Sequence, residues 1–158
     1  MATRVQPQLL SEFKKDSITM NARENQVSRF QKAMEQPIDT ELSSKQLILR
    51  MSFIDEEVKE LRDEVLTAVK ELEETKAVSH QVHVNLLKEL GDVMYVASGF
   101  AVTFGLPISR AFDRIHESNM SKMVDGKAIK NDEGKVMKGP NYRPPILGDL
   151  VSDQLELF

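Results

Sequence analysis

The sequence predicts an all-α fold, a helical bundle, and three observations support it. Up to about residue 122, apolar residues recur every three or four positions, which is the period of amphipathic helices. Proline stands at the ends of the periodic stretches, at Pro37 and Pro107. The connections between the stretches are short, as in helix bundles. We expect one domain over residues 1–158, because no linker rich in proline, glycine or serine divides the chain.

Two helices are expected in the first half of the chain. The first covers residues 23–36, where Val27, Phe30 and Met34 keep helical spacing, and it stops at Pro37. The second is long and runs from about residue 44 to 76, with one apolar face and no proline or glycine inside it. The apolar positions of this face are Leu47, Met51, Ile54, Val58, Leu61, Val65, Val69 and Leu72.

Two further helices are expected after it. The third contains "NLLKELGDVMYVASGFAVTFGLP", which begins at Asn85, and it ends near Gly105. Its uncharged run is too short for a membrane span. Pro107 suits the first turn of the fourth helix, which carries Ile108 and Phe112 at helical spacing.

The chain changes character after the helical core, which we place at residues 21–122. The tail, residues 123–158, is rich in glycine, lysine and proline and has no helical period. Within it, "NDEG" between "KAIK" and "KVMK" predicts either a short β-hairpin or an irregular loop. Residues 1–20 are interpreted as an N-terminal extension, because their scattered charges are unlike a signal peptide.

The long second helix also predicts assembly. Beyond Glu64 its apolar face continues through Val65, Val69 and Leu72, and the other helices are too short to cover its full length within one subunit. A symmetric bundle formed between subunits would cover this face. We therefore expect a homodimer or a homotetramer.

Composition excludes several classes of function. The chain has 21 basic and 25 acidic residues and a net charge of −4, so it has no general attraction for nucleic acid. It has no cysteine, which rules out disulfides, thiolate nucleophiles and zinc held by sulfur. His80 and His83 lack a third local ligand for zinc and are interpreted as surface residues. We expect a cytoplasmic protein that binds neither nucleic acid nor membranes.

Two pairs of acids, each three residues apart, are the strongest functional signal. "EEVKE" supplies Glu57 and Glu60 on the second helix, and "ELGD" supplies Glu89 and Asp92 on the third. Each pair lies at the border of its apolar face, so two adjacent helices can bring four carboxylates together. Without a cation these charges would repel one another. With one, they would form an oxygen cage suited to Mg²⁺ or Mn²⁺.

Plainer interpretations of the acids stay open. Glu89 and Asp92 lie in the first turns of their expected helix, where solvent and the helix dipole favour negative charge. One Glu-x-x-Glu pair is a weak signal, because Glu71 and Glu74 have the same spacing and are expected to be solvated. A non-catalytic helical interaction module is the alternative from another class, since apolar helix faces and eight methionines suit a partner helix.

The two motifs resemble a known superfamily. "EEVKE" followed by "ELGD" is similar to the E-x-x-E…E-x-x-D signature of the all-α nucleoside triphosphate pyrophosphohydrolases, which include MazG-type enzymes, phosphoribosyl-ATP pyrophosphohydrolases and dimeric dUTPases. The resemblance extends from "VSRFQKAMEQP" to "HESNMSK" and "DGKAIKNDEGKVMKGPNYRPP". This last region is more similar to MazG-like and phosphoribosyl-ATP pyrophosphohydrolase-like members than to two-domain MazG proteins.

The resemblance implies hydrolysis of a nucleoside triphosphate between its α- and β-phosphates, dependent on Mg²⁺. A house-cleaning or dUTP-directed role is compatible with it, and phosphoribosyl-ATP is the alternative substrate. Glu57, Glu60, Glu89 and Asp92 would bind Mg²⁺, or Mn²⁺ in its place, and Glu56 would orient or deprotonate a water. The substrate contacts suggested in this way are Asn119, Lys122, Lys127, Arg143 and Gln31.

Overall fold

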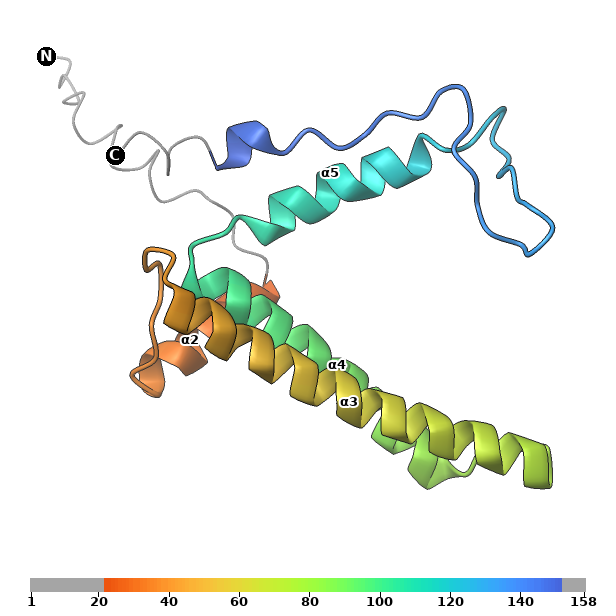
Figure 1. Ribbon diagram of the computed structural model, residues 1–158, viewed down its shortest axis with the longest axis horizontal. Helices are drawn as coiled ribbons and strands as arrows, with labels where there is room; N and C mark the ends of the chain where they lie inside the picture. Colours follow the sequence, from red (N-terminus) through yellow and green to blue (C-terminus); the bar gives the residue numbers. More distant parts are fainter. Residues whose placement is uncertain (1–21, 152–158) are drawn as a thin grey trace, which may run out of the picture. The chain divides into compact units, whose positions relative to one another are not determined.

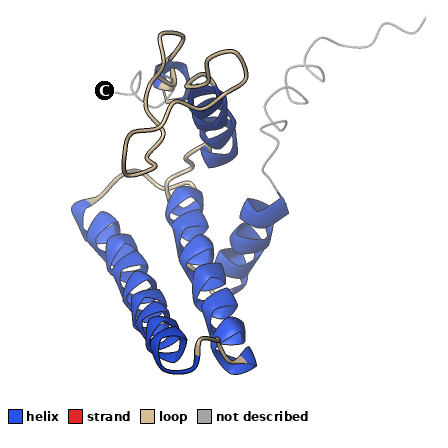
Figure 2. Cartoon of the chain, turned by 90° about the vertical axis from the view of Figure 1, so that its right-hand side faces the viewer, coloured by secondary structure: helices blue, strands red, loops and turns tan. Residues whose placement is uncertain are grey.

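The computed structural model describes residues 22–151, which form four α-helices and one short 3₁₀ helix without a strand (Figure 1, Figure 2). The predicted all-α fold class is therefore confirmed. The described residues fall into two compact units, 22–106 and 107–151. One domain over the whole chain stays a prediction, and the expected extension at residues 1–20 lies outside the described part.

The first unit contains helices α2 (Ala22–Ala33), α3 (Ser44–Thr75) and α4 (His80–Thr103). Helix α4 packs against both of the others, and α3 and α4 lie side by side as a helical hairpin (Figure 1). Helix α4 begins five residues earlier than Asn85, because Ser79 supplies a cap there. The remaining helix boundaries agree with the expected ones to within a few residues.

Local sequence sets the ends of this hairpin. Ser43 and Ser79 cap α3 and α4, and each hydroxyl accepts a backbone N–H from the first turn at 3.3 Å. At the end of α3, Lys76 takes up a left-handed conformation with a φ of 63°, and its N–H donates to the Leu72 carbonyl oxygen. The chain therefore leaves α3 and enters α4 within a few residues.

Glu71 closes the same connection. Its carboxylate accepts the Ser79 backbone N–H at 2.6 Å and the Ser79 hydroxyl at 2.9 Å. The prediction that Glu71 is merely solvated is therefore wrong. Glu74 does lie at the surface, where its carboxylate is 4.0 Å from Lys70 Nζ. Of this acid pair, Glu71 alone joins the two helices.

Helix α2 contacts α4 through a buried polar cluster. Val27 and Gln31 are each 1 % exposed, and Thr103 is fully buried. Gln31 Nε2 donates to the Pro37 carbonyl oxygen at 2.7 Å and to Thr103 Oγ1 at 3.1 Å, while the Thr103 hydroxyl donates to the Gly99 carbonyl oxygen at 2.8 Å. A Cβ atom at Gly99 would lie 3.2 Å from Gln31 Oε1. The absence of a side chain at Gly99 thus leaves room for Gln31.

Replacing Thr103 with valine is expected to lower the free energy of unfolding by about 1–2 kcal/mol, because the buried Gln31 amide loses an acceptor while the side-chain volume is kept. Urea denaturation measures this change. Thr67→Val is the matched control, since the Thr67 hydroxyl donates to the Asp63 carbonyl oxygen on an exposed turn of α3. Its effect should stay within about 0.5 kcal/mol. Equal losses in the two variants would contradict a role for the buried cluster.

The second unit is built on helix α5 (Ile108–Met120), with the tail held against it. The Ser118 hydroxyl donates to the Arg143 carbonyl oxygen at 2.7 Å. Further along, Arg114 Nη1 donates to the Ile146 carbonyl oxygen at 2.6 Å. Polar side chains of α5 therefore hold the tail in place by hydrogen bonds to the carbonyl oxygens of the tail.

The described part of the tail, residues 123–151, is irregular apart from one 3₁₀ helix, Gly148–Leu150. The turn at "NDEG" is present, with the Gly134 N–H donating to the Asn131 carbonyl oxygen at 2.9 Å and a φ of 80° at Gly134. Beside it, Lys130 and Val136 form an isolated β-bridge and not a strand. The Asn131 and Met137 N–H groups donate to the Lys135 and Ile129 carbonyl oxygens at 3.0 and 2.8 Å, so the turn carries the hydrogen bonds of a minimal hairpin while the rest of the described tail is irregular.

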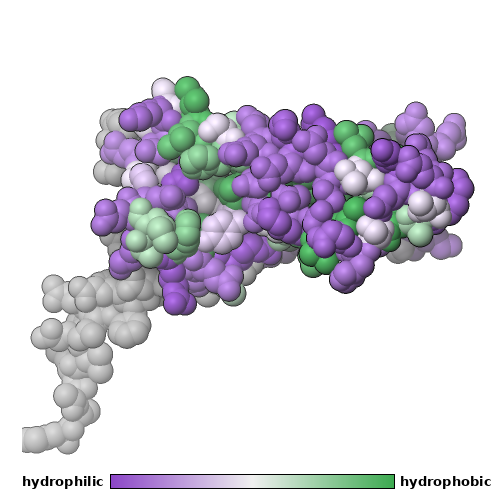
Figure 3. Space-filling model, turned by 90° about the horizontal axis from the view of Figure 1, so that it is seen from below, coloured by the Kyte–Doolittle hydropathy of each residue, from purple (hydrophilic) through white to green (hydrophobic). Residues whose placement is uncertain are grey.

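Apolar side chains remain exposed along the hairpin. Val65, Val69 and Leu72 on α3 are 44 %, 44 % and 46 % exposed. The space-filling view shows apolar groups interrupting a hydrophilic surface (Figure 3). Among the described residues, no single helix combines the length and apolar character needed to cross a membrane. Helices α4 and α5 meet that criterion only when they are taken together.

Candidate metal centre

The α3–α4 hairpin brings three of the four predicted metal ligands together. One carboxylate oxygen from each of Glu57, Glu60 and Glu89 lies within 4.8 Å of the other two. Glu57 and Glu89 are half-buried, whereas Glu60 is exposed. The compact carboxylate group is therefore partly buried at Glu57 and Glu89 and open to solvent at Glu60.

Asp92 is not a member of this compact group. Its carboxylate oxygen lies 2.9 Å from Lys88 Nζ, one helical turn earlier on α4. Asp92 is nevertheless close enough to Glu57 to act on it electrostatically. The structure thus places the fourth predicted ligand beside the other three, with its charge directed toward a lysine.

Burial raises the pKa of Glu57 above its ordinary value, and repulsion by Asp92 and then by Glu60 raises it further. Lys88 acts in the opposite direction and favours the charged carboxylate, while Glu56 adds a smaller repulsion. A bound cation would favour the charged form as well. The donor set consists only of carboxylate oxygens, which fits a hard divalent cation such as Mg²⁺ or Mn²⁺.

Lys88 is a contributor to the site that the acid motifs did not predict. Its Nζ donates to both carboxylate oxygens of Glu89, at 3.0 and 3.1 Å, in addition to its ion pair with Asp92. Hydrogen bonds to Asp92 and Glu89 hold the pKa of Lys88 above its ordinary range. The sequence signal was the spacing of four residues between Lys88 and Asp92, which favours an ion pair on a helix.

Asn85 is a second contributor that sequence reasoning missed. Its Nδ2 donates to Glu64 Oε1 at 3.0 Å and so joins α4 to α3. On α3, Glu64 lies one turn beyond Glu60, and on α4, Asn85 lies one turn before Glu89. This hydrogen bond therefore fixes the register of the two helices next to the acids.

The predicted base, Glu56, is exposed on α3. Adjacent residues of a helix point about 100° apart, so Glu56 faces a different direction from Glu57. The negative charge of Glu56 nevertheless repels that of Glu57 and helps to raise the pKa of Glu57. Glu56 is therefore not a member of the compact carboxylate group but lies next to it.

Gln31, the predicted contact on the first helix, lies inside the first unit. Its amide nitrogen is satisfied by Pro37 and Thr103, as described above, and its Oε1 atom has no hydrogen-bond partner among the described residues. Its neighbour Phe30 is 41 % exposed and makes an edge contact with the Tyr95 ring, with centroids 5.7 Å apart. Because Gln31 is 1 % exposed and Oε1 is itself buried, a substrate contact by this residue would require α2 to move, and it stays a prediction.

The other predicted substrate contacts belong to the second unit. Lys122 Nζ donates to Asn119 Oδ1 at 2.7 Å, so these two predicted residues do lie together. Lys127 is exposed, and its backbone pairs with Val124 in a tight turn. The roles of these side chains toward phosphate stay predictions.

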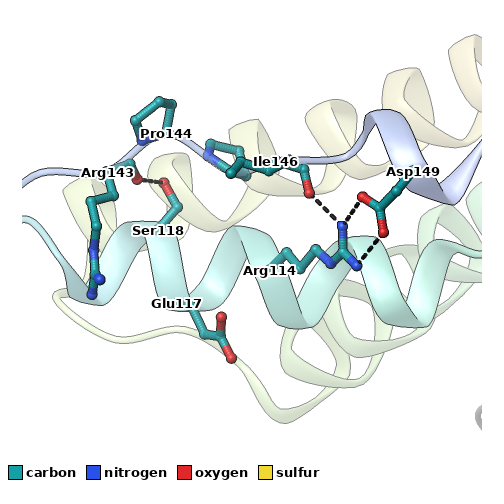
Figure 4. A pocket seen from close by; sticks show the side chains of 8 residues that line it. Arg114, Glu117, Ser118, Arg143, Pro144, Ile146 and Asp149 are labelled. Atoms are coloured by element: carbon teal, nitrogen blue, oxygen red, sulfur yellow. Dashed lines mark hydrogen bonds and ion pairs between the residues drawn. The ribbon is translucent and has the colours of Figure 1, made fainter.

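Arg143 lines an open pocket of about 430 Å³ in this unit (Figure 4). At the opposite end of the pocket, the Arg114 guanidinium holds the Asp149 carboxylate, with the second of the two contacts at 2.7 Å. This pairing lowers the pKa of Asp149 below its ordinary value. Arg143 and Glu117 also line the pocket and are not part of the ion pair between Arg114 and Asp149.

Comparison with known proteins identifies one family. The sequence profile of the phosphoribosyl-ATP pyrophosphohydrolase family matches residues 24–119, which is more than half of the chain and includes both acid pairs. The tail residues Lys122, Lys127 and Arg143 lie beyond the matched region. A search of curated proteins found no match.

Proposed function

The chain belongs to the phosphoribosyl-ATP pyrophosphohydrolase family of all-α nucleoside triphosphate pyrophosphatases, and from this premise we propose that it hydrolyses a nucleoside 5′-triphosphate between the α- and β-phosphates with Mg²⁺. Phosphoribosyl-ATP, which carries such a triphosphate, is the first substrate to test. Other nucleoside triphosphates, dUTP included, are the second. The observation that carries this proposal is the convergence of Glu57, Glu60 and Glu89 on the hairpin.

We propose that Glu57, Glu60, Glu89 and Asp92 hold the metal. A bound Mg²⁺ would neutralise the triphosphate and stabilise charge on the leaving pyrophosphate. The carboxylate oxygens match the ligands that Mg²⁺ takes, and the exposure of Glu60 leaves one side of the group open to substrate. The pKa of Glu57, raised by burial and then by the charges of Asp92 and Glu60, supports this role, because a bound cation would favour the charged carboxylate.

Glu56 is the proposed general base. As an exposed carboxylate that borders the compact group, it can accept the proton of the attacking water without giving up a metal ligand. Loss of that proton from the water increases its nucleophilicity toward phosphorus. Pyrophosphate leaves, and the nucleoside monophosphate is the second product.

The deciding experiment incubates the protein and Mg²⁺ with phosphoribosyl-ATP and, separately, with a panel of nucleoside triphosphates, and measures pyrophosphate against orthophosphate. Pyrophosphate together with a monophosphate would support the proposal, and the most efficient substrate names the preferred nucleotide. Orthophosphate as the first product would contradict it. Absence of turnover, together with no thermal stabilisation by Mg²⁺ or Mn²⁺, would favour the non-catalytic helical module.

The exposed apolar face of α3 supports assembly as a homodimer or homotetramer. Light scattering at micromolar concentration is expected to give a multiple of the chain mass, and Val69→Lys should shift the distribution toward monomer because a charge would enter the interface. Thr67→Lys is the control, placed on the same helix outside this apolar face. A wild-type monomer would contradict the prediction.

A cytoplasmic location without nucleic-acid or membrane partners also stays a prediction.

A further inference from the structure

We propose that Lys88 is a tethered cation that competes with the divalent metal for Glu89 and Asp92, and so sets the metal concentration at which the site fills. This inference rests on the proposed function, since it takes Glu89 and Asp92 as metal ligands. It concerns a residue outside the acid motifs, and it assigns that residue an effect on metal binding and not on the chemical step.

The contacts of Lys88 carry the inference. Its Nζ lies 3.0 and 3.1 Å from the two oxygens of Glu89 and 2.9 Å from an oxygen of Asp92. An ammonium group has three N–H donors, so the number of short contacts equals the number of donors. All of them are directed at proposed metal ligands. Lys88 therefore holds two of the four ligand carboxylates with a positive charge of its own.

Lys88 cannot keep all its contacts with the Glu89 and Asp92 oxygens while a divalent ion is bound to the same oxygens. A metal at the usual Mg²⁺–oxygen distance of about 2.0–2.1 Å would bring a double positive charge close to the ammonium. The repulsion between the two cations grows as the distance shortens and is only partly screened near a protein surface. Binding of the metal must therefore weaken or break the contacts of Lys88.

The exposure of the partners makes such an exchange feasible. The Lys88 side chain is 60 % exposed, so its charged end can turn into water without passing through the core. The Glu89 side chain is only 13 % exposed and stays at the site. Of the three partners, Lys88 is the most exposed, Asp92 is 41 % exposed, and Glu89 is the one held in place by burial.

Helix α3 offers an exposed ion pair with the same sequence spacing and without this consequence. Lys59 Nζ lies 3.2 Å from the Asp63 carboxylate, again with a spacing of four residues, and Asp63 is not a proposed ligand. Removing Lys59 deletes the same positive charge from a neighbouring part of the hairpin. Lys59→Met is therefore the matched control for Lys88→Met.

The test measures metal binding by the full chain, without substrate. Mn²⁺ is titrated into wild type, Lys88→Met and Lys59→Met, and free Mn²⁺ is followed by its electron paramagnetic resonance signal. Lys88→Met is expected to lower the Mn²⁺ dissociation constant by about three- to tenfold, which corresponds to the loss of a competing exposed ion pair. Lys59→Met should change it less than about twofold.

Thermal melts without metal give a second readout. Lys88→Met should melt at a lower temperature than wild type, because the gathered carboxylates lose their internal cation, and saturating Mn²⁺ should remove most of that difference. Helix content from circular dichroism verifies folding. If Lys88→Met does not fold, Lys88→Gln provides the same titration with a shorter neutral side chain.

The outcomes separate this inference from the proposed function. An unchanged or larger dissociation constant in a folded Lys88→Met protein would overturn the competition. Binding of Mn²⁺ by Lys88→Met alone would support the competition strongly. If neither protein binds Mn²⁺, the proposed metal site itself is wrong, and the competition is wrong with it.

Discussion

The Asp92→Asn variant is expected to lose at least about a hundredfold in turnover, because an amide replaces an anionic metal ligand in a site built only of carboxylates. Pyrophosphate release at saturating Mg²⁺ measures this loss. The stability of the metal-free protein should stay within about 1 kcal/mol of wild type. The change is small because two effects oppose each other: the exposed ion pair between Asp92 and Lys88 is lost, and the repulsion between Asp92 and Glu57 is removed.

Asp63→Asn is the control for this variant. Asp63 forms the equivalent exposed pair with Lys59 on α3, so its replacement removes the same charge and leaves the proposed ligands intact. Mg²⁺ should raise the melting temperature of wild type and Asp63→Asn, and raise that of Asp92→Asn much less. Wild-type turnover in Asp92→Asn, or equal stabilisation of all three proteins by Mg²⁺, would remove Asp92 from the metal site.

The second large effect is expected for Glu56→Gln. Loss of a general base should lower kcat by about 10²–10⁴-fold, while the Mg²⁺ dissociation constant stays close to that of wild type because Glu56 lies outside the compact carboxylate group. The measurement pairs single-turnover rates with metal titration. A variant that loses metal binding would instead identify Glu56 as a ligand.

Asp55→Asn supplies the control for Glu56→Gln. Asp55 is the preceding residue on α3 and is also exposed, so it tests the effect of one lost negative charge in the same region. Its kcat should remain within about threefold of wild type, since general electrostatic effects at exposed positions are weak. A similar loss in both variants would indicate a field effect and not proton transfer.

The helices and the acid pairs were predictable because both depend on short-range patterns. The apolar spacing from Leu47 to Leu72 identifies α3 by its period alone. The spacing of three residues within each acid pair places both carboxylates on one side of a helix. Two long helices with a short connection are expected to lie side by side. The register that places Glu57 near Glu89 depends on contacts between the helices, such as the hydrogen bond from Asn85 to Glu64.

The features that were missed depend on contacts between distant residues or on side-chain rotamers. Gln31 is buried because α2 packs on α4, where Thr103 supplies its partner from a position 72 residues along the chain. Glu71 was misjudged because its partner, Ser79, belongs to the next helix. Lys88 was overlooked because a lysine next to an acid usually points into solvent, and only its rotamer shows that it holds Glu89.

The short connection between α3 and α4 has a consequence for folding kinetics. Every group that shapes it, from Lys76 at the end of α3 to Ser79 and Glu71, acts within a few residues. The hydrogen bond from Asn85 to Glu64, next to the acids, spans 21 residues, whereas the one from Gln31 to Thr103 spans 72. Closing the shorter chain loop costs less entropy. Helical hairpins of this kind have low contact order, which favours rapid formation. We therefore expect the acids of the candidate metal centre to be gathered early, before α2 docks and completes the buried cluster around Gln31.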